Sequence, residues 1–243
     1  AGKCHTKFID ETPELFEFTE SRDRATRVLK YIANIQVNNP DAERHQYDTP
    51  RFPKAQREVT KQDGLKLLLD TDGPEAVKEW VLGQKKLLIT DTTMRDAHQS
   101  LLSTRLRTRD MVKGADGTAD ILADCFSLEM WGGATFDTAY RFLHESPWER
   151  LEMLREKIPN IPFQMLLRGS NLVGYASYPD NLVRAFIAES AREGIDVFRV
   201  FDSLNWMPNM ETAMDEVLRQ GKFLEGTVCY TGDILDPTRD RYT

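Results

Sequence analysis

Residues 162–201 read PFQMLLRGSNLVGYASYPDNLVRAFIAESAREGIDVFRVF, and they contain the clearest structural pattern in the 243-residue chain. Two apolar runs within them, Pro162–Leu167 and Ile195–Phe201, have the composition of buried strands. Between these runs, Pro179–Glu193 carries apolar residues at helical spacing, and Gly194 provides a stop signal. A strand, a helix and another strand in this order predict a parallel β/α/β unit.

The same alternation continues on both sides of this unit. Ser146 begins a capping box with Pro147 at the first helical position, and apolar residues follow at helical spacing. The segment Asn209–Gln220 repeats this plan, with Gly221 after it. Another predicted helix contains Lys113–Thr118, whose glycines should weaken it by about 1 kcal/mol each. The remaining strand candidates are Leu87–Asp91, Cys125–Met130 and Leu224–Tyr230.

Two architectures are compatible with repeated parallel units, a doubly wound sheet and a (β/α)8 barrel. A doubly wound sheet usually has a glycine-rich phosphate loop after a strand, and this sequence has none. Polar residues instead follow the strand candidates, where barrel enzymes build their sites. These residues are Arg95-Asp96, Gly132-Gly133, Arg168, Asp202 and Thr231-Gly232-Asp233. We therefore predict an α/β fold, an incomplete (β/α)8 TIM barrel with about five of its eight strands.

The region before the predicted barrel has a different pattern. Ser21 can cap a helix whose apolar positions are Ala25, Val28, Leu29, Ile32 and Ile35. Residues 36–60 are polar and contain prolines, which is typical of a linker. Two short helical segments are expected around Lys61–Leu69 and Gly73–Leu82. We therefore divide the chain into residues 1–18, 19–84 and 85–243.

Composition limits the possible functions. With 40% hydrophobic and 29% charged residues the chain can form a core, and its net charge of −7 argues against nucleic-acid binding. The sequence lacks an apolar run of about 18 residues, so no membrane span is expected. Three widely spaced cysteines, Cys4, Cys125 and Cys229, favour reduced thiols in a cytoplasmic protein. Because the sequence starts without Met, we interpret it as an excised fragment.

Two charged residues that follow strand candidates could bind a substrate or a metal. Asp96 lies beside Arg95 and just before His98-Gln99, and its carboxylate could hold a divalent metal that polarises a carbonyl oxygen. The alternative is that Asp96 caps the next turn and pairs with Arg95, which spacing alone favours. Arg168 could bind a carboxylate through two hydrogen bonds, or it could form a structural salt bridge across the barrel top.

Other residues give weaker indications of chemistry. Spacing predicts that Asp137, after the pair Gly132-Gly133, caps the helix that follows. The four histidines are isolated in the sequence: His5, His45, His98 and His144. A metal shell of three protein ligands is therefore difficult to draw. Cysteines inside apolar runs are more typical of inert buried thiols than of nucleophiles.

Several long sequence words resemble one enzyme family. Leu88–Leu102, LITDTTMRDAHQSLL, and Phe126–Asp137, FSLEMWGGATFD, closely resemble the start of the carboxyltransferase domain of biotin-dependent pyruvate carboxylases. Three shorter words continue the resemblance in the same order: Pro147–Leu151, Gln164–Gly169 and Phe198–Asn205. Upstream, Ala1–Phe16 resembles the C-terminal edge of the biotin carboxylase module of the same family.

This resemblance implies a role for each part of the chain. Residues 1–18 would be the edge of the biotin carboxylase module, residues 19–84 a connecting and allosteric region, and residues 85–243 the N-terminal part of the carboxyltransferase barrel. Members of the family move a carboxyl group from carboxybiotin, formed with ATP in another module, to pyruvate. The product is oxaloacetate. A homotetramer and an acyl-CoA effector are also implied.

The resemblance also implies the site residues. The substrate-binding signature matches Arg95, Asp96, Ala97, His98, Gln99 and Arg168. Of these, Asp96 matches a ligand of a divalent metal (Mn, Zn or Mg), and the catalytic residues would be Arg95, Gln99 and Arg168. Asp137 and Tyr175 match a pair that shapes the pocket for the biotin ring. The family's other metal ligands, its proton-moving threonine and its biotinyl lysine have no counterpart here, so the chain alone is expected to lack full activity.

Two alternatives remain open at this point. A carboxyltransferase subunit of a transcarboxylase or oxaloacetate decarboxylase would share the Arg-Asp-Ala-His-Gln signature, but it should lack the upstream biotin-carboxylase-like segment. A non-catalytic regulatory or assembly fragment would place the function in the middle region. There, Arg22, Arg24 and Arg27 could meet an acidic effector, although the charge pattern favours a solvated helix face.

Overall fold

The structure is a computed structural model that describes residues 11–12, 26–38 and 64–230. The chain divides into two compact units, Ala1–Arg51 and Phe52–Thr243, and each is described by itself. No helix in the described ranges is long and apolar enough to cross a membrane.

Helix α2, Arg27–Asn38, is the main described element of the first unit. The predicted start of this helix, from Ser21 to Ala25, lies outside the described residues. The helix continues to Asn38, so the linker predicted from residue 36 onward begins too early. Most of the apolar side chains along α2 are at least half exposed.

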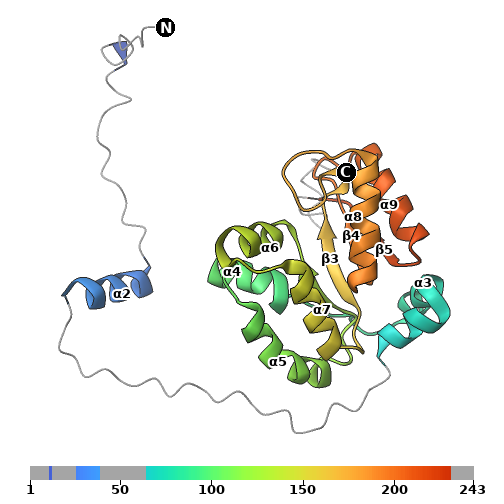
Figure 1. The fold of residues 1–243 in the computed structure, drawn as a ribbon, viewed down its shortest axis with the longest axis horizontal. Helices are drawn as coiled ribbons and strands as arrows, with labels where there is room; N and C mark the ends of the chain where they lie inside the picture. The colour runs from blue at the N-terminus through green and yellow to red at the C-terminus, as the bar shows by residue number, and fades with distance from the viewer. Residues whose placement is uncertain (1–10, 13–25, 39–63, 231–243) are drawn as a thin grey trace, which may run out of the picture. The chain divides into compact units, whose positions relative to one another are not determined.

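The second unit is built on a parallel sheet of five strands in the order β1-β2-β3-β4-β5. Strands β3, β4 and β5 are labelled in Figure 1. The strands are β1 Thr90–Asp91, β2 Ser127–Trp131, β3 Phe163–Leu167, β4 Val197–Val200 and β5 Phe223–Gly226. Strand order equals chain order, which is the arrangement of consecutive strands in a barrel. The predicted α/β fold of parallel strands is therefore confirmed.

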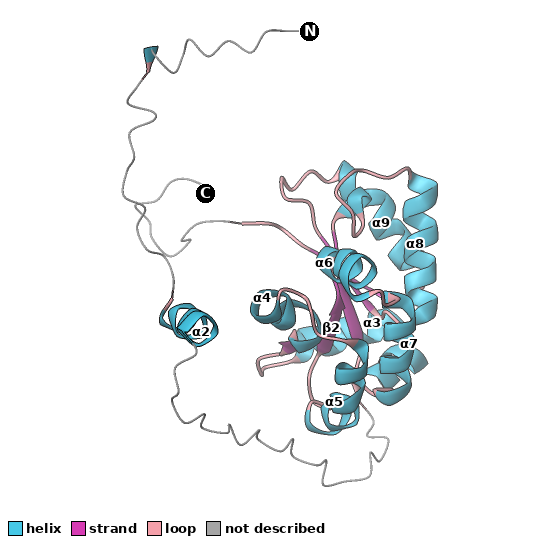
Figure 2. Ribbon diagram, turned by 60° about the vertical axis from the view of Figure 1, so that its left-hand side comes forward, coloured by secondary structure: helices cyan, strands magenta, loops and turns pink. Residues whose placement is uncertain are grey.

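Helices alternate with these strands and pack beside them, as Figure 2 shows. They are α3 Leu65–Gly83, η2 Thr93–Ala97, α4 His98–Leu102, α5 Thr108–Ile121, α6 Gly133–Thr138, η3 Ala139–Leu143, α7 Pro147–Lys157, η4 Gly169–Asn171, α8 Asp180–Glu193 and α9 Pro208–Arg219. The end signals predicted at Ser146 and Gly194 are confirmed. Ser146 Oγ accepts the N–H of Glu149 at 3.3 Å where α7 begins, and Gly194 follows α8 with a φ of 121°.

The two outer strands are shorter than predicted. β1 covers only Thr90–Asp91 of the expected Leu87–Asp91, and β5 ends at Gly226 instead of Tyr230. Within the described part of the chain, β1 and β5 each pair with a strand on one side only. Fewer hydrogen bonds therefore hold these two strands in a regular ladder.

The glycines of two helical regions have different effects on the helix. α5 contains Gly114 and Gly117 and still forms without interruption, because its buried residues Met111, Ala115 and Ala119 pack into the core. α3 is kinked at Gly73, whose φ of 82° is left-handed and separates the two helical segments expected there. Residues 61–63 of the first predicted segment lie outside the described residues.

The two faces of the sheet differ in polarity. Side chains on one face pack with the helices into the core, and Leu128, Phe163, Met165 and Phe198 on this face are completely buried. The other face carries several polar side chains among apolar ones. There, Ser127 Oγ lies 2.9 Å from both Thr90 Oγ1 and Gln164 Oε1, and Arg199 Nε donates to Glu225 Oε2 at 2.6 Å.

Candidate active site

Parallel strands bring their C-terminal ends to one edge of the sheet, which we call the mouth. The candidates for binding substrate, metal and biotin that the resemblance implies all lie in the segments that follow β1, β2 and β3. Asp91, the last residue of β1, accepts the N–H and the hydroxyl of Thr93, both at 3.0 Å. Asp91, not Asp96, therefore caps the turn that leads into η2.

Arg95 is held between two carboxylates at the mouth. Its Nε donates to Glu129 Oε2 and its Nη1 donates to Asp96 Oδ1, each at 2.9 Å. The Glu129 side chain is 2% exposed and lies on the polar face of β2. Because a buried carboxylate fixes one edge of the guanidinium, Arg95 has a defined orientation before any ligand binds.

Asp96 is open to solvent on its other side. Its side chain is 49% exposed, and the pairing with Arg95 uses only Oδ1. The predicted pairing of Asp96 with Arg95 is therefore present, whereas the predicted capping by Asp96 is wrong. A half-exposed carboxylate with one oxygen available fits a single metal ligand.

The rest of the signature divides into buried and accessible residues. His98 is only 3% exposed, and its Nε2 lies 2.8 Å from the carbonyl oxygen of Met94. Burial lowers the pKa of His98, and the Met94 carbonyl opposes this only partly. The imidazole is therefore neutral at pH 7, and it supports η2 through its contact with the Met94 carbonyl. Ala97 and Gln99 are both partly exposed.

The chain at the end of β2 approaches two arginines closely. A register shift between Glu129 and Trp131 marks a bulge just before the glycine pair. A Cβ at Gly132 would lie 3.1 Å from Arg95 Cδ, and a Cβ at Gly133 would lie 3.2 Å from Arg168 Nη2. The two glycines therefore allow both guanidinium groups to reach the mouth.

Arg168 is positioned by the loop that follows it. Its Nη1 donates to the carbonyl oxygen of Gly174 at 3.3 Å, and its guanidinium carbon lies 5.6 Å from the centre of the Tyr175 ring. No carboxylate among the described residues pairs with Arg168. The structural salt bridge considered from the sequence is therefore not seen there, and N–H groups of Arg168 remain for a ligand.

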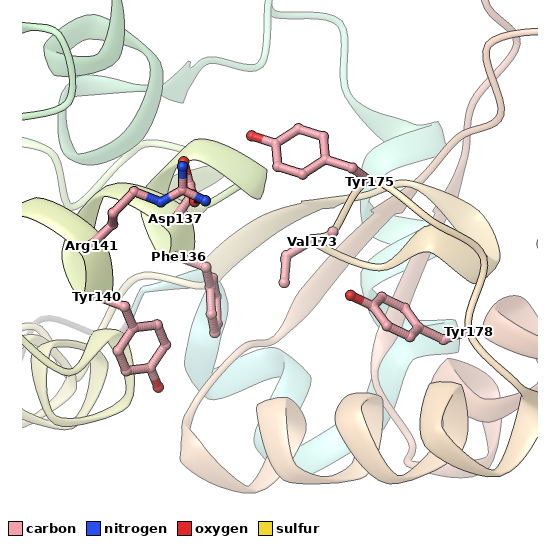
Figure 3. Close-up of a pocket in the computed structure, with 8 residues that line it drawn as sticks. Phe136, Asp137, Tyr140, Arg141, Val173, Tyr175 and Tyr178 are labelled. Atoms are coloured by element: carbon pink, nitrogen blue, oxygen red, sulfur yellow. Dashed lines mark ion pairs between the residues drawn. The ribbon is translucent and has the colours of Figure 1, made fainter. Parts of the chain in front are cut away.

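Asp137 and Tyr175 line the same cavity, which has a volume of about 480 Å³. Figure 3 shows the Tyr175 ring reaching toward Asp137 across this space, with Phe136 and Val173 at its inner side. Asp137 lies inside α6 and pairs with Arg141 at 2.9 Å, so the predicted cap at Asp137 is wrong. Gly132 occupies the N-cap position of α6 instead.

The described part of the chain gives little support for a metal site with several protein ligands or for a cysteine nucleophile. It contains no group of three or more His, Cys, Asp or Glu side chains that could hold a metal. Cys125 and Cys229 are free, and burial raises the pKa of the Cys125 thiol, which makes it a poorer nucleophile at neutral pH.

Several solved structures with a similar fold are carboxyltransferase domains. The domain of Rhizobium etli pyruvate carboxylase with 3-hydroxypyruvate has a TM-score of 0.74 and 53% identity, over 78% of this chain and 32% of that chain. The same domain with oxamate and biotin has a TM-score of 0.73 and 54% identity, over 75% of this chain and 31% of that chain. The fold and its mouth therefore define a carboxyltransferase-type α/β domain, which confirms the predicted barrel architecture.

Curated relatives narrow this class further. Pyruvate carboxylase of Staphylococcus aureus is 56% identical over 98% of this chain and 21% of the relative's length. Pyruvate carboxylase of Bacillus subtilis is 52% identical over 99% of this chain and 21% of that relative. No protein-family model matches. The chain belongs to the pyruvate carboxylase family and spans about a fifth of the length of these relatives.

Proposed function

We propose that this chain forms the pyruvate-binding and biotin-binding side of a carboxyltransferase site that converts pyruvate into oxaloacetate. The observation that carries the proposal is the position of Arg168. Its guanidinium lies against Gly133 at the mouth and also contacts the loop with Tyr175, which lines the cavity together with Asp137. One arginine therefore joins the two candidate subsites.

The residues at the mouth suit an α-keto acid. Pyruvate offers a carboxylate and a carbonyl oxygen, and Arg95, Gln99 and Arg168 offer N–H donors for these oxygens. Removal of a proton from the methyl group places negative charge on the carbonyl oxygen. Guanidinium groups that are already oriented would stabilise that charge without further reorganisation. His98 would act by supporting η2, because it is buried.

Two groups would complete the chemistry. A divalent metal held in part by Asp96, such as Mn, Zn or Mg, would polarise the pyruvate oxygen. Carboxybiotin would supply the carboxyl group, and its ring would occupy the cavity between Asp137 and Tyr175. Related structures support the biotin assignment, since one Rhizobium etli domain was solved with pyruvate and biocytin, at a TM-score of 0.72 and 54% identity.

The identity of the relatives favours pyruvate carboxylase over the other readings of the sequence. The curated matches extend over nearly the whole chain, including the part before the sheet. A separate carboxyltransferase subunit of a transcarboxylase or decarboxylase would not be expected to match there.

Several finer assignments remain proposals from the resemblance. They are the division into residues 1–18, 19–84 and 85–243, an ATP-dependent step in another module, a homotetramer and an acyl-CoA effector. Cytoplasmic localisation is also a proposal, because the relatives include a human mitochondrial enzyme that is 47% identical.

Biocytin binding to the 243-residue chain tests the cavity directly. We expect binding detectable by saturation-transfer NMR, and about tenfold weaker binding for Tyr175→Ala, because an aromatic contact contributes about 1 kcal/mol beyond burial. Tyr175 is 73% exposed, so its removal should leave the fold intact. The matched control is Tyr31→Ala, which removes an exposed tyrosine from α2.

The proposal fails if the chain does not bind biocytin, or if Tyr175→Ala and Asp137→Ala bind it as well as the unchanged chain. A loss of equal size in Tyr31→Ala would show that the measured binding is not specific to the cavity.

A further inference from the structure

The loop that carries Tyr175 is folded tightly upon itself. Arg168 N donates to the Leu172 carbonyl at 3.1 Å, and Tyr178 N donates to the Ser170 carbonyl at 2.9 Å. Leu172 has a φ of 51°, an unusual backbone conformation for a branched residue. A strained loop persists only where surrounding contacts hold it, so the residues packed against this loop determine whether it keeps its conformation.

The first turn of α9 lies directly against this loop. A Cβ at Gly169 would be 2.5 Å from the carbonyl oxygen of Asn209, and the φ of Gly169 is +45°. Only glycine allows this approach without displacement of one of the two backbones. In addition, the hydroxyl of Ser170 donates to Oδ1 of Asn209.

Asn209 is itself fixed by the loop after β4. Its Nδ2 donates to Asp202 Oδ1 at 2.8 Å, while Asp202 Oδ2 accepts the N–H groups of Trp206 at 2.9 Å and Leu204 at 2.8 Å. The Trp206 N–H, followed by the Asn209 amide, lowers the pKa of Asp202. Asp202 is therefore a charged, firmly held acceptor at neutral pH.

We propose that Asn209 is a positioning residue for the biotin subsite, and that it acts by linking Asp202 to Ser170. This inference rests on the proposed function. The hydrogen-bond chain Asp202–Asn209–Ser170 holds the loop that presents Tyr175 to the cavity and offers the Gly174 carbonyl to Arg168. Asn209 touches neither pyruvate nor biotin, so its effect passes through Arg168 and Tyr175.

The position of this chain separates its effect from general stability. Asp202, Asn209 and Ser170 are all partly exposed and lie at the mouth, outside the buried core. Loss of one such hydrogen bond changes stability only slightly, whereas it releases a loop with unfavourable backbone angles. Ligand binding should therefore respond more strongly than folding.

Biocytin titration of the 243-residue chain tests this role. We expect Asn209→Ala and Ser170→Ala each to weaken binding about fivefold, and the double variant to be no weaker than either, because both break the same link. Ser170→Thr retains the hydroxyl and should retain the affinity. The matched control is Asn205→Gly. Asn205 lies in the loop after β4, as Asp202 does, but it makes its two side-chain hydrogen bonds to the backbone of Cys229.

A second measurement reports the loop itself without biocytin. In chain labelled with 3-fluorotyrosine, the signals of Tyr175 and Tyr178, assigned with Phe variants, should shift or broaden in Asn209→Ala and stay unchanged in Asn205→Gly. Unchanged signals in Asn209→Ala would overturn the inference, as would unchanged biocytin affinity. If the unchanged chain does not bind biocytin, the proposed function fails, and the fluorine signals alone decide whether Asn209 positions the loop.

Discussion

The two ends of the parallel sheet both carry clusters of charged side chains, but the protein surrounds them very differently. At the base, before β4, the carboxylate of Asp196 is completely buried. It contacts Arg155 at 2.6 Å, Lys66 at 3.2 Å and Lys222 at 3.3 Å, and it accepts the N–H of Phe163 at 3.0 Å. Both of its oxygens are occupied.

At the mouth, the charged groups are only partly enclosed. Arg95 is fixed by buried Glu129, yet the Asp96 side chain is 49% exposed and that of Asp137 is 29% exposed. Their free oxygens face solvent or the cavity. In barrel folds, residues at the C-terminal strand ends carry chemistry and those at the other end carry stability. The carboxylate at the base is fully paired and those at the mouth are only partly paired, which agrees with this division between stability and chemistry.

The largest expected effect concerns the base. Asp196→Ala leaves three cations without their shared carboxylate and should lower the free energy of unfolding by about 3–5 kcal/mol, as measured by urea denaturation. The control Asp116→Ala breaks an exposed pair with Lys157 at 3.7 Å and should cost less than about 0.5 kcal/mol. Similar values for the two variants would contradict a stabilising role for the base.

A smaller loss of stability is expected at the mouth. Arg95→Ala leaves Glu129 buried without its cation and should lower the free energy of unfolding by about 2 kcal/mol in urea. Adding Glu129→Gln removes the buried charge, so the double variant should recover part of this loss. If Glu129→Gln gives no recovery, the pairing does not hold Arg95 in the way described.

The smallest effect concerns pH. His98 has a lowered pKa in the folded chain, so the unfolded chain takes up a proton more readily as pH falls below about 6.5. Stability should therefore be constant above that pH and decrease below it. Urea denaturation at pH 7.5 and 5.5 measures the difference, which His98→Gln should reduce. An equal pH dependence in both proteins would exclude His98 as its cause.

Much of the fold could be predicted from the sequence because the signals are local. Gly194 ends α8, Ser146 begins α7, and polar residues follow the strands at the mouth. The lengths of β1 and β5 could not be predicted in this way. They depend on which neighbours each strand has in the sheet, and this information is not contained in the strand's own residues.

The site was predicted less completely for a similar reason. A charged residue inside the apolar run FSLEMW was a signal that Glu129 needs a partner, and it could have identified the link to Arg95. By contrast, nothing near Asn209 in the sequence indicates its contact with Ser170. Spacing also suggested caps at Asp96 and Asp137, whereas Asp91 and Gly132 occupy those roles.

The most direct test of the proposed carboxyltransferase site is Asp96→Ala in a full-length enzyme that carries this sequence. Oxaloacetate formation from pyruvate and bicarbonate-dependent ATP cleavage would be measured side by side. We predict that carboxylation of pyruvate is lost, because the proposed metal would lose a ligand, while ATP cleavage in the proposed biotin carboxylase module continues. Pyruvate turnover that stays near normal would contradict the assignment of Asp96 and with it the proposed site.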